Sequence, residues 1–203
     1  HTVPGTAPLV PEITLHLASE ITPIWRATEE WLRQANIEPP FWAFAWPGGQ
    51  ATARHLLDHP EAIRGKRVLD FAAGCGIAAI AAAMSGAAGV EAAEIDPLAL
   101  AACRLNAALN GVTLATPEGD VVGSDSRWDI ILCGDVCYEA PMTAHILPWL
   151  RRMAATGTEV WLADPGRAYL PKEGLEPLAT HAVPTTLELE DRTERVVTIA
   201  RLL

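Results

Sequence analysis

The chain has 203 residues, of which half are hydrophobic and a fifth are charged, and its formal net charge is −10. This length and composition allow a sizeable core, which excludes general disorder and favours one domain over residues 1–203. The sequence has no basic run of the kind that a nucleic-acid duplex requires, and its longest alanine-rich stretch, residues 77–88, is too short to span a bilayer. We therefore expect a protein that binds neither nucleic acid nor membrane, and whose acidic surface attracts a basic protein surface.

The four cysteines bear on metal binding and on the redox environment. None belongs to a C-x2-C pair, so their spacing argues against a structural zinc site, and we expect no metal. Three lie in apolar segments, where a free thiol acts as a small hydrophobe. The start of the chain shows no secretory signal. We expect a cytoplasmic protein, and we expect it to be a monomer.

Residues 1–60 are predicted to form an N-terminal helical and aromatic segment. Residues 1–12 contain three prolines and are typical of an irregular arm. From residue 13 to residue 35, apolar side chains recur at helical spacing and predict one helix, interrupted near Pro23. An extended aromatic stretch follows over residues 39–50, and its Pro-Gly-Gly turn opens a helix that ends near Leu57.

Residues 65–203 alternate between strand and helix patterns. Asp96-Pro97 is a strong helix start, with Asp96 as the N-cap and Pro97 at the first helical position. Alternating β and α elements that end in a hairpin predict an α/β fold, with a mostly parallel sheet covered on both faces and an antiparallel edge. The predicted strands are 68–71, 89–94, 130–133 and 158–163 with a hairpin of 185–189 and 195–202, and the predicted helices are 77–84, 96–110 and 142–155.

A glycine-rich turn, Asp70-Phe71-Ala72-Ala73-Gly74-Cys75-Gly76, joins the first of these strands to its helix. Gly74 and Gly76 lack Cβ atoms, so the backbone can turn sharply and a ligand can come close. Glu94 closes the next strand about 20 residues on, where a carboxylate accepts hydrogen bonds from ribose hydroxyls. The pattern predicts a cofactor that contains a nucleoside.

Two cofactors use this geometry. Gly74-x-Gly76-x-x-Ala79 also fits a relaxed dinucleotide fingerprint, so NAD is an alternative. Asp70 discriminates between them, because a carboxylate at the end of the strand repels a pyrophosphate and attracts the cationic amino group and sulfonium of S-adenosylmethionine. Asp70 therefore favours the methyl donor.

Asp120 follows Gly119, where a third strand is expected to end. Its carboxylate would there accept a hydrogen bond from the adenine amino group. A solvated loop aspartate is an equally good interpretation, and both stay open.

Four segments together resemble the seven-β-strand protein methyltransferases, specifically the electron transfer flavoprotein β-subunit lysine methyltransferases and their bacterial relatives. The segments are Trp46-Pro-Gly-Gly-Gln50, residues 68–76, Gly134-Asp-Val-Cys-Tyr-Glu139 and Asp164-Pro-Gly-Arg167, and the resemblance spans about residues 35–170. It implies a Rossmann-like class I methyltransferase core over residues 65–203 with a seven-stranded sheet, and a cytoplasmic or mitochondrial location. It also implies S-adenosylmethionine as the cofactor and the flavoprotein β subunit as the partner that is methylated on lysine.

Carried over residue by residue, the resemblance assigns a set of cofactor contacts and a methyl-transfer motif. Asp135 and Tyr138 match the motif that borders the methyl-transfer site, and Glu139 follows them. The Asp164–Pro171 loop has no chemistry that the sequence justifies. The cofactor contacts expected from the motifs and the spacing together are Trp46, Gln50, Asp70, Ala72, Gly74, Gly76, Glu94, Ile95, Asp120 and Asp135.

Methyl transfer is an in-line displacement that needs no covalent intermediate, so alignment of donor and acceptor would supply several kcal/mol of catalysis. Asp135 would direct the incoming amine, with a helix cap before Pro141 as its alternative role. Tyr138 would flank the methyl path, where its ring face favours the cationic product. Glu139 is either a proton acceptor or a surface acid.

Three further side chains are open to two interpretations. Trp46 is a candidate site residue, whereas core packing is the better interpretation of Phe44 and Trp42. Arg167 binds either a feature of a partner or a surface carboxylate. Two alternative functions also remain: a small-molecule N- or O-methyltransferase, which needs an enclosed acceptor pocket, and a non-catalytic donor-binding module, against which Asp135 and Tyr138 argue.

Overall fold

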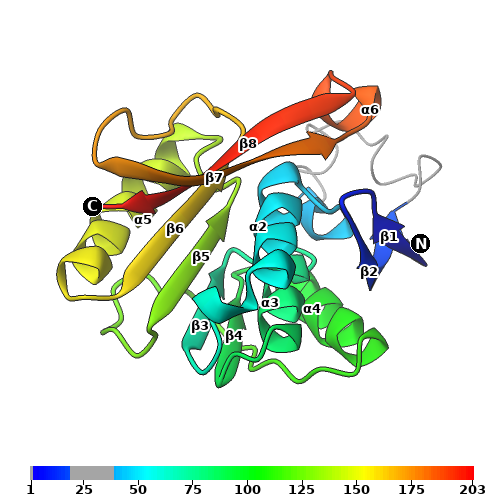
Figure 1. Ribbon diagram of the computed structural model, residues 1–203, viewed down its shortest axis with the longest axis horizontal. Coiled ribbons are helices and arrows are strands. Elements are labelled where there is room, and N and C mark those ends of the chain that lie inside the picture. The colour runs from blue at the N-terminus through cyan, green and yellow to red at the C-terminus, as the bar shows by residue number, and fades with distance from the viewer. Residues whose placement is uncertain (1, 19–38) are drawn as a thin grey trace.

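The computed structural model describes residues 2–18 and 39–203, and it has an α/β core built on one six-stranded sheet (Figure 1). The strand order is β4-β3-β5-β6-β8-β7. The first four strands are parallel, and β8 joins β6 and β7 antiparallel. The bounds are β3 Arg67–Phe71, β4 Gly89–Ala93, β5 Ile130–Gly134, β6 Glu159–Asp164, β7 Leu175–Pro184 and β8 Glu194–Leu202.

Helices cover both faces of this sheet, as the sequence predicts. Alternate side chains of each strand point to opposite faces, so Val68 packs with α2 and α3 while Leu69 packs with α5. None of the helices in the described ranges has the length and apolar character needed to cross a membrane. The helices are α2 Pro47–Asp58, α3 Ile77–Met84, α4 Pro97–Leu109, α5 Ala140–Ala155 and α6 Leu187–Glu190, with 3-10 turns η1 Phe41–Ala43 and η2 Pro60–Ala62.

The N-terminus differs from the prediction. β1 Thr2–Ala7 and β2 Val10–Ala18 form an antiparallel hairpin, so the irregular arm and the first part of the predicted helix are wrong. The rest of that predicted helix, residues 19–35, lies outside the described residues. Ile13 and Leu15 are fully buried on one side of β2, a period of two that the helical interpretation overlooked.

Two asparagines, Asn106 of α4 and its C-cap residue Asn110, hold the hairpin in place. The side-chain oxygen of Asn110 accepts from the Thr14 amide at 3.0 Å, and that of Asn106 accepts from the His16 amide at 2.7 Å. Asp96 caps the same helix as predicted, because its carboxylate accepts from the Leu98 amide at 2.8 Å. The hairpin therefore rests on the core through side-chain to backbone hydrogen bonds that the sequence pattern did not reveal.

The C-terminal hairpin is confirmed in its second strand only. Its first strand is β7, ten residues long, whereas the predicted strand 185–189 overlaps the short helix α6. β7 contains Pro177 and Pro184, and it is an edge strand with a bulge, where proline is tolerated. The seventh strand is reduced, in the described part of the chain, to an isolated bridge between Glu91 and Ala115.

Candidate functional site

The glycine-rich turn between β3 and α3 lies at the carboxyl end of the parallel strands, where ligands bind in such sheets. Its backbone enters the left-handed region three times, at Ala72, Gly74 and Gly76, with φ of 53°, 54° and 77°. A Cβ on Gly76 would lie 3.1 Å from the Cys103 sulfur, so glycine also allows α4 to pack closely. A small cleft opens over this turn, and Trp46, Gly49, Asp70 and Gly134 are among the residues that line it.

Asp70 is one of the residues that line this cleft. Its side chain is buried, and one oxygen accepts from the Ala79 amide in the first turn of α3 at 2.8 Å. Burial raises the pKa of Asp70 to about 7, and the charge of Glu94 adds to this rise. Among the described residues, no lysine or arginine forms an ion pair with Asp70, so a cationic ligand is well suited to stabilise its charged form.

Glu94 contacts the turn directly. It follows the end of β4, and its carboxylate accepts from the Gly74 amide at 2.6 Å. Burial raises the pKa of Glu94 as well. The structure thus brings the predicted glycine turn and the predicted ribose acid together. Ile95, the next residue, is largely exposed.

Asp120 does not lie at the end of a strand. It occupies an exposed loop, where one oxygen accepts from the Val122 amide at 2.8 Å and the other lies 2.8 Å from His145 Nε2. It is not among the described residues that line the cleft. These contacts favour the loop-aspartate interpretation over an adenine contact.

Asp135 follows β5 in a left-handed conformation, with φ of 56°. Its carboxylate is engaged on both sides: Oδ2 accepts from the Gly48 amide, and Oδ1 accepts from Arg167 Nη2 and Nε at 2.7 and 3.0 Å. Asp135 therefore caps α2, whereas the predicted alternative placed it before α5, whose N-cap is Glu139. Burial raises the pKa of Asp135 to about 6, although Arg167 opposes this rise.

The Trp46-Pro47-Gly48-Gly49 segment packs unusually closely on the sheet. A Cβ on Gly48 would lie 2.4 Å from the Ala163 carbonyl oxygen, and one on Gly134 would lie 2.9 Å from the Gly49 amide nitrogen. Two glycines on facing elements thus let the start of α2 reach the ends of β5 and β6. This contact explains the Pro-Gly-Gly sequence by packing.

Gln50, in the first turns of α2, is buried, and it is not among the described residues that line the cleft. Its amide nitrogen donates to the Ala45 carbonyl at 2.7 Å, and its oxygen accepts from the Leu9 amide at 3.3 Å. Gln50 therefore ties the N-terminal hairpin to α2. Its predicted contact with the donor stays a prediction.

Aromatic rings form a rim beside the cleft. The Phe41 ring centroid lies 5.8 Å from those of Trp46 and Tyr138, and the Trp46 indole donates to the Phe41 carbonyl at 2.8 Å. Phe44, interpreted from sequence as core packing, is half-buried and lines the cleft with Trp46. Tyr138 and the neighbouring Glu139 are both exposed.

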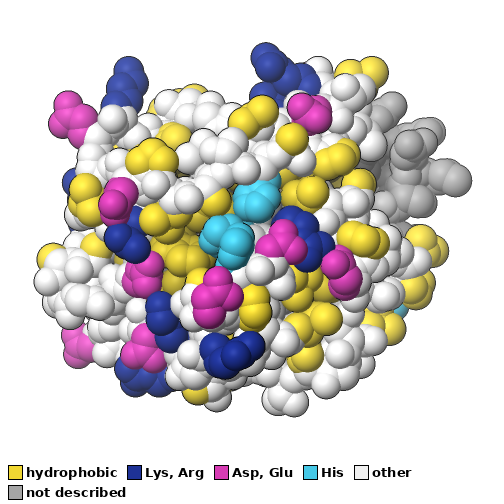
Figure 2. Space-filling model, viewed as in Figure 1, with side chains coloured by type: hydrophobic (Ala, Val, Ile, Leu, Met, Phe, Trp, Pro, Cys, Tyr) yellow, Lys and Arg dark blue, Asp and Glu magenta, His cyan; other side chains and the backbone are white. Residues whose placement is uncertain are grey.

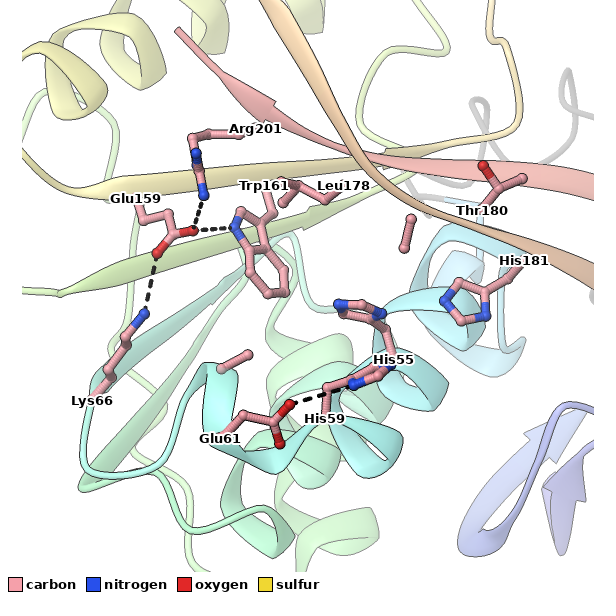
Figure 3. Close-up of a pocket in the computed structure, with 12 residues that line it drawn as sticks. His55, His59, Glu61, Lys66, Glu159, Trp161, Leu178, Thr180, His181 and Arg201 are labelled. Atoms are coloured by element: carbon pink, nitrogen blue, oxygen red, sulfur yellow. Dashed lines mark hydrogen bonds and ion pairs between the residues drawn. The ribbon is translucent and has the colours of Figure 1, made fainter.

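A larger groove, of about 640 Å³, lies at the other end of α2. The groove is surrounded by His55 of α2, the C-cap residue His59, Trp161 of β6 and His181 of β7. Figure 2 shows a hollow with an apolar floor beside the histidines. The dashed contacts in Figure 3 run from Glu159 to Lys66, Trp161 and Arg201 and from His59 to Glu61. The groove contains none of the predicted site residues.

Comparison with known proteins identifies the family. The model for ribosomal protein L11 methyltransferase (PrmA) matches residues 21–138. The electron transfer flavoprotein beta subunit lysine methyltransferase of Xenopus laevis is 40% identical over 198 residues, which cover 94% of this chain and 79% of that protein. The protein of the same name from Danio rerio is 38% identical over 190 residues, covering 90% and 72%. The chain belongs to the electron transfer flavoprotein β-subunit lysine methyltransferase family.

Solved structures agree with this family at the level of the fold. The ribosomal protein L11 methylase from Lactobacillus delbrueckii subsp. bulgaricus has a TM-score of 0.52 at 21% identity, over 75% of this chain and 78% of that chain. Magnesium protoporphyrin IX methyltransferase from Synechocystis, solved with bound SAH, has a TM-score of 0.54 at 19% identity, over 76% and 84%. The resemblance found in the sequence is therefore confirmed, and this member of the family is a methyltransferase with the class I fold.

Proposed function

We propose that the protein transfers the methyl group of S-adenosylmethionine to a lysine amine of the electron transfer flavoprotein β subunit. The observation that carries the donor assignment is the pair of carboxylates at the glycine turn, the buried Asp70 and the half-buried Glu94. No lysine or arginine is among the described residues that line the cleft. A diphosphate would meet uncompensated negative charge there, whereas a cationic donor would relieve it.

The described residues fit each part of this donor. Glu94 would accept from the ribose hydroxyls, Asp70 would face the cationic amino acid end, and Ile95 would lie against the adenine. Ala72, Gly74 and Gly76 shape the turn through their left-handed backbone, and the missing Cβ of Gly74 would let the donor approach closely. When bound, S-adenosylmethionine supplies the electrophilic methyl group.

The aromatic rim suits a lysine acceptor. Its ring faces favour the methylene chain and the cationic head of lysine, and the open position of Tyr138 suits a side chain presented by a protein surface. Glu139 beside it would attract the approaching ammonium. The lysine ammonium would pass its proton to Glu139 or to solvent water and lose its water shell before the neutral amine attacks, and the rim would help to exclude water. In this proposal Tyr138 is a catalytic residue that lies beside the path of the methyl group, and Trp46 borders the same path.

A net charge of −10 supports a basic surface as the partner. All four cysteines are buried and free, which supports a reducing compartment such as the cytoplasm. A small-molecule methyltransferase would need an enclosed acceptor pocket, and the exposed rim argues against one.

The test is to incubate the enzyme with labelled S-adenosylmethionine and purified flavoprotein, then measure the mass of each subunit. We expect the β subunit to gain whole methyl groups on lysine, and Glu94→Ala to be inactive as the control. Label in small amines with an unchanged β subunit would reject the substrate while retaining the donor. Calorimetry that shows tight NAD binding and no heat with S-adenosylmethionine would reject both.

A further inference from the structure

A chain of ion pairs runs from the C-terminal hairpin to the cleft. Arg195 Nε donates to Glu190 Oε2 at 2.9 Å, and Arg167 Nη1 donates to the same oxygen at 3.1 Å. Arg167 then donates through Nε and Nη2 to Asp135, which accepts from the Gly48 amide through its other oxygen. The chain therefore links β8, α6, the loop after β6 and the loop after β5 to the first turn of α2.

The charges in this chain compensate one another away from water. Only 1% of the Glu190 side chain and 9% of the Asp135 side chain are exposed. Arg167 lies between the two carboxylates and is 20% exposed. Since two arginines face two acids, the chain is neutral as a whole, and loss of one member leaves a buried charge without its partner.

The Gly48 end of the chain borders the cleft. Gly49, the next residue, and Trp46, two residues earlier, both line it, as does Gly134 on the facing strand. A Cβ added to Gly134 would lie 2.9 Å from the Gly49 amide nitrogen, so α2 and β5 approach too closely here for a side chain between them. A small displacement of α2 should therefore change the width of the cleft at the end of β5. Displacing the reacting atoms by about 1 Å can lower the rate of the chemical step by about 100-fold.

We propose that Arg167 and Glu190 are positioning residues for methyl transfer, which act through Asp135 to hold the start of α2 against the sheet beside the methyl path. This inference rests on the proposed function. It also gives the Asp164–Pro171 loop a role: Asp164 Oδ1 accepts from the Gly166 and Arg167 amides, both at 2.6 Å, and so aims Arg167 at Asp135.

The charge of Asp135 is the property through which Arg167 acts. Arg167 favours the ionised carboxylate, while burial and the nearby charge of Asp164 oppose it. Glu190 faces Arg167 from α6, Arg195 of β8 pairs with the same Glu190, and the Gly48 amide faces Asp135 from α2. Without Arg167 the carboxyl should hold its proton to higher pH, and its hydrogen bond with Gly48 should weaken over that range.

The test compares Arg167→Met, Arg167→Lys and Glu190→Gln with the matched control Arg201→Met, whose arginine pairs with Glu159 and Glu176 away from the cleft. The measurements are kcat and acceptor KM, the affinity for S-adenosylhomocysteine, the acid limb of the kcat profile, and the pH titration of the Gly48 amide resonance.

For Arg167→Met we expect kcat to fall at least about tenfold with donor affinity within about threefold of wild type, a loss confined to the transition state. The acid limb and the Gly48 midpoint should both rise by about one pH unit. Arg167→Lys should restore part of kcat and of both pH midpoints, and Glu190→Gln should give values between those of Arg167→Met and wild type. Arg201→Met should match wild type in all of them.

An unshifted Gly48 midpoint, or a fall in kcat that only follows the unfolded fraction, would overturn the inference. So would an equal loss of donor affinity in Arg167→Met. If the wild type methylates no acceptor, the proposed function fails, but the Gly48 titration still tests whether Arg167 sets the charge of Asp135.

Discussion

Asp70 should make donor binding depend on pH in the neutral range. If the donor binds only the ionised carboxylate, a pKa of about 7 leaves roughly nine tenths of the sites competent at pH 8 and one tenth at pH 6. The donor affinity should therefore fall roughly tenfold between these values, a loss of about 1.4 kcal/mol. Isothermal titration with S-adenosylmethionine at a series of pH values measures this directly.

The same carboxyl should affect stability in the opposite direction. Its pKa in the fold is about 7 against an ordinary value of 3.8, so its contribution to the unfolding free energy is present below about pH 4 and is lost as the pH rises to about 7. That loss is of the order of 4 kcal/mol at pH 8. Asp70→Asn cannot ionise but keeps an oxygen for the Ala79 amide, so it should be more stable than wild type at pH 8.

Asp70→Asn should thus gain stability and lose both donor affinity and its pH dependence. The control is Asp129→Asn, because Asp129 pairs with Arg67 before β5, at the opposite end of the strands. Equal donor affinity of wild type at pH 6 and pH 8, or an Asp70→Asn variant that keeps the wild-type slope, would refute the reasoning.

The other predictions concern the same end of the sheet. Glu94→Gln should weaken S-adenosylhomocysteine binding at least about tenfold, since it removes a charged acceptor, and calorimetry showing unchanged affinity would contradict this. Gly48→Ala places a Cβ 2.4 Å from the Ala163 carbonyl oxygen. It should cost about 1–3 kcal/mol in urea unfolding and lower kcat, whereas Gly5→Ala, whose nearest neighbour is 3.9 Å away, should do neither. Tyr138→Ala should raise acceptor KM severalfold and leave donor affinity unchanged, and an unchanged KM would remove Tyr138 from the acceptor path.

Sequence reasoning predicted best where local signals and packing agree. The helix over residues 77–84 and the start of α4 at Asp96-Pro97 were found because a glycine turn and an N-cap mark them. The first strand of the N-terminal hairpin was missed because the three prolines of residues 1–12 suggested an irregular arm. β2 was missed because Leu17 fits a helical and an alternating pattern equally well. The two asparagines that support β2, Asn106 and Asn110, lie 90 and 96 residues away in the chain from their partners, and no local pattern reveals such pairs.

At the site, sequence reasoning found the carboxylates but not what each one contacts. The spacing from Gly74 to Glu94 was informative because both follow adjacent strands. The partner of Asp135 was not predictable, since Arg167 and Gly48 come from segments 32 and 87 residues distant. The pairing of Arg167 with Glu190 follows from the rule that a buried acid needs a cationic partner. The sequence could not reveal this pairing, because the burial of Glu190 in a polar segment cannot be predicted from composition.

The contacts of two buried acids explain why they take different roles. Asp70 receives one backbone hydrogen bond and, within the described residues, no ion pair, so its charge stays costly until a cationic ligand arrives. Asp135 is buried to a similar degree, yet an arginine and a helix amide already satisfy both of its oxygens. A buried carboxylate without an ion-pair partner favours binding of a cation. A buried carboxylate whose oxygens already accept hydrogen bonds instead fixes the position of the groups that donate them. We therefore expect Asp70 to contribute mainly donor affinity and Asp135 mainly the shape of the cleft. An Asp70 variant that lowers kcat without weakening donor binding, together with an Asp135 variant that only weakens donor binding, would show that burial, rather than the partners of each acid, decides their roles.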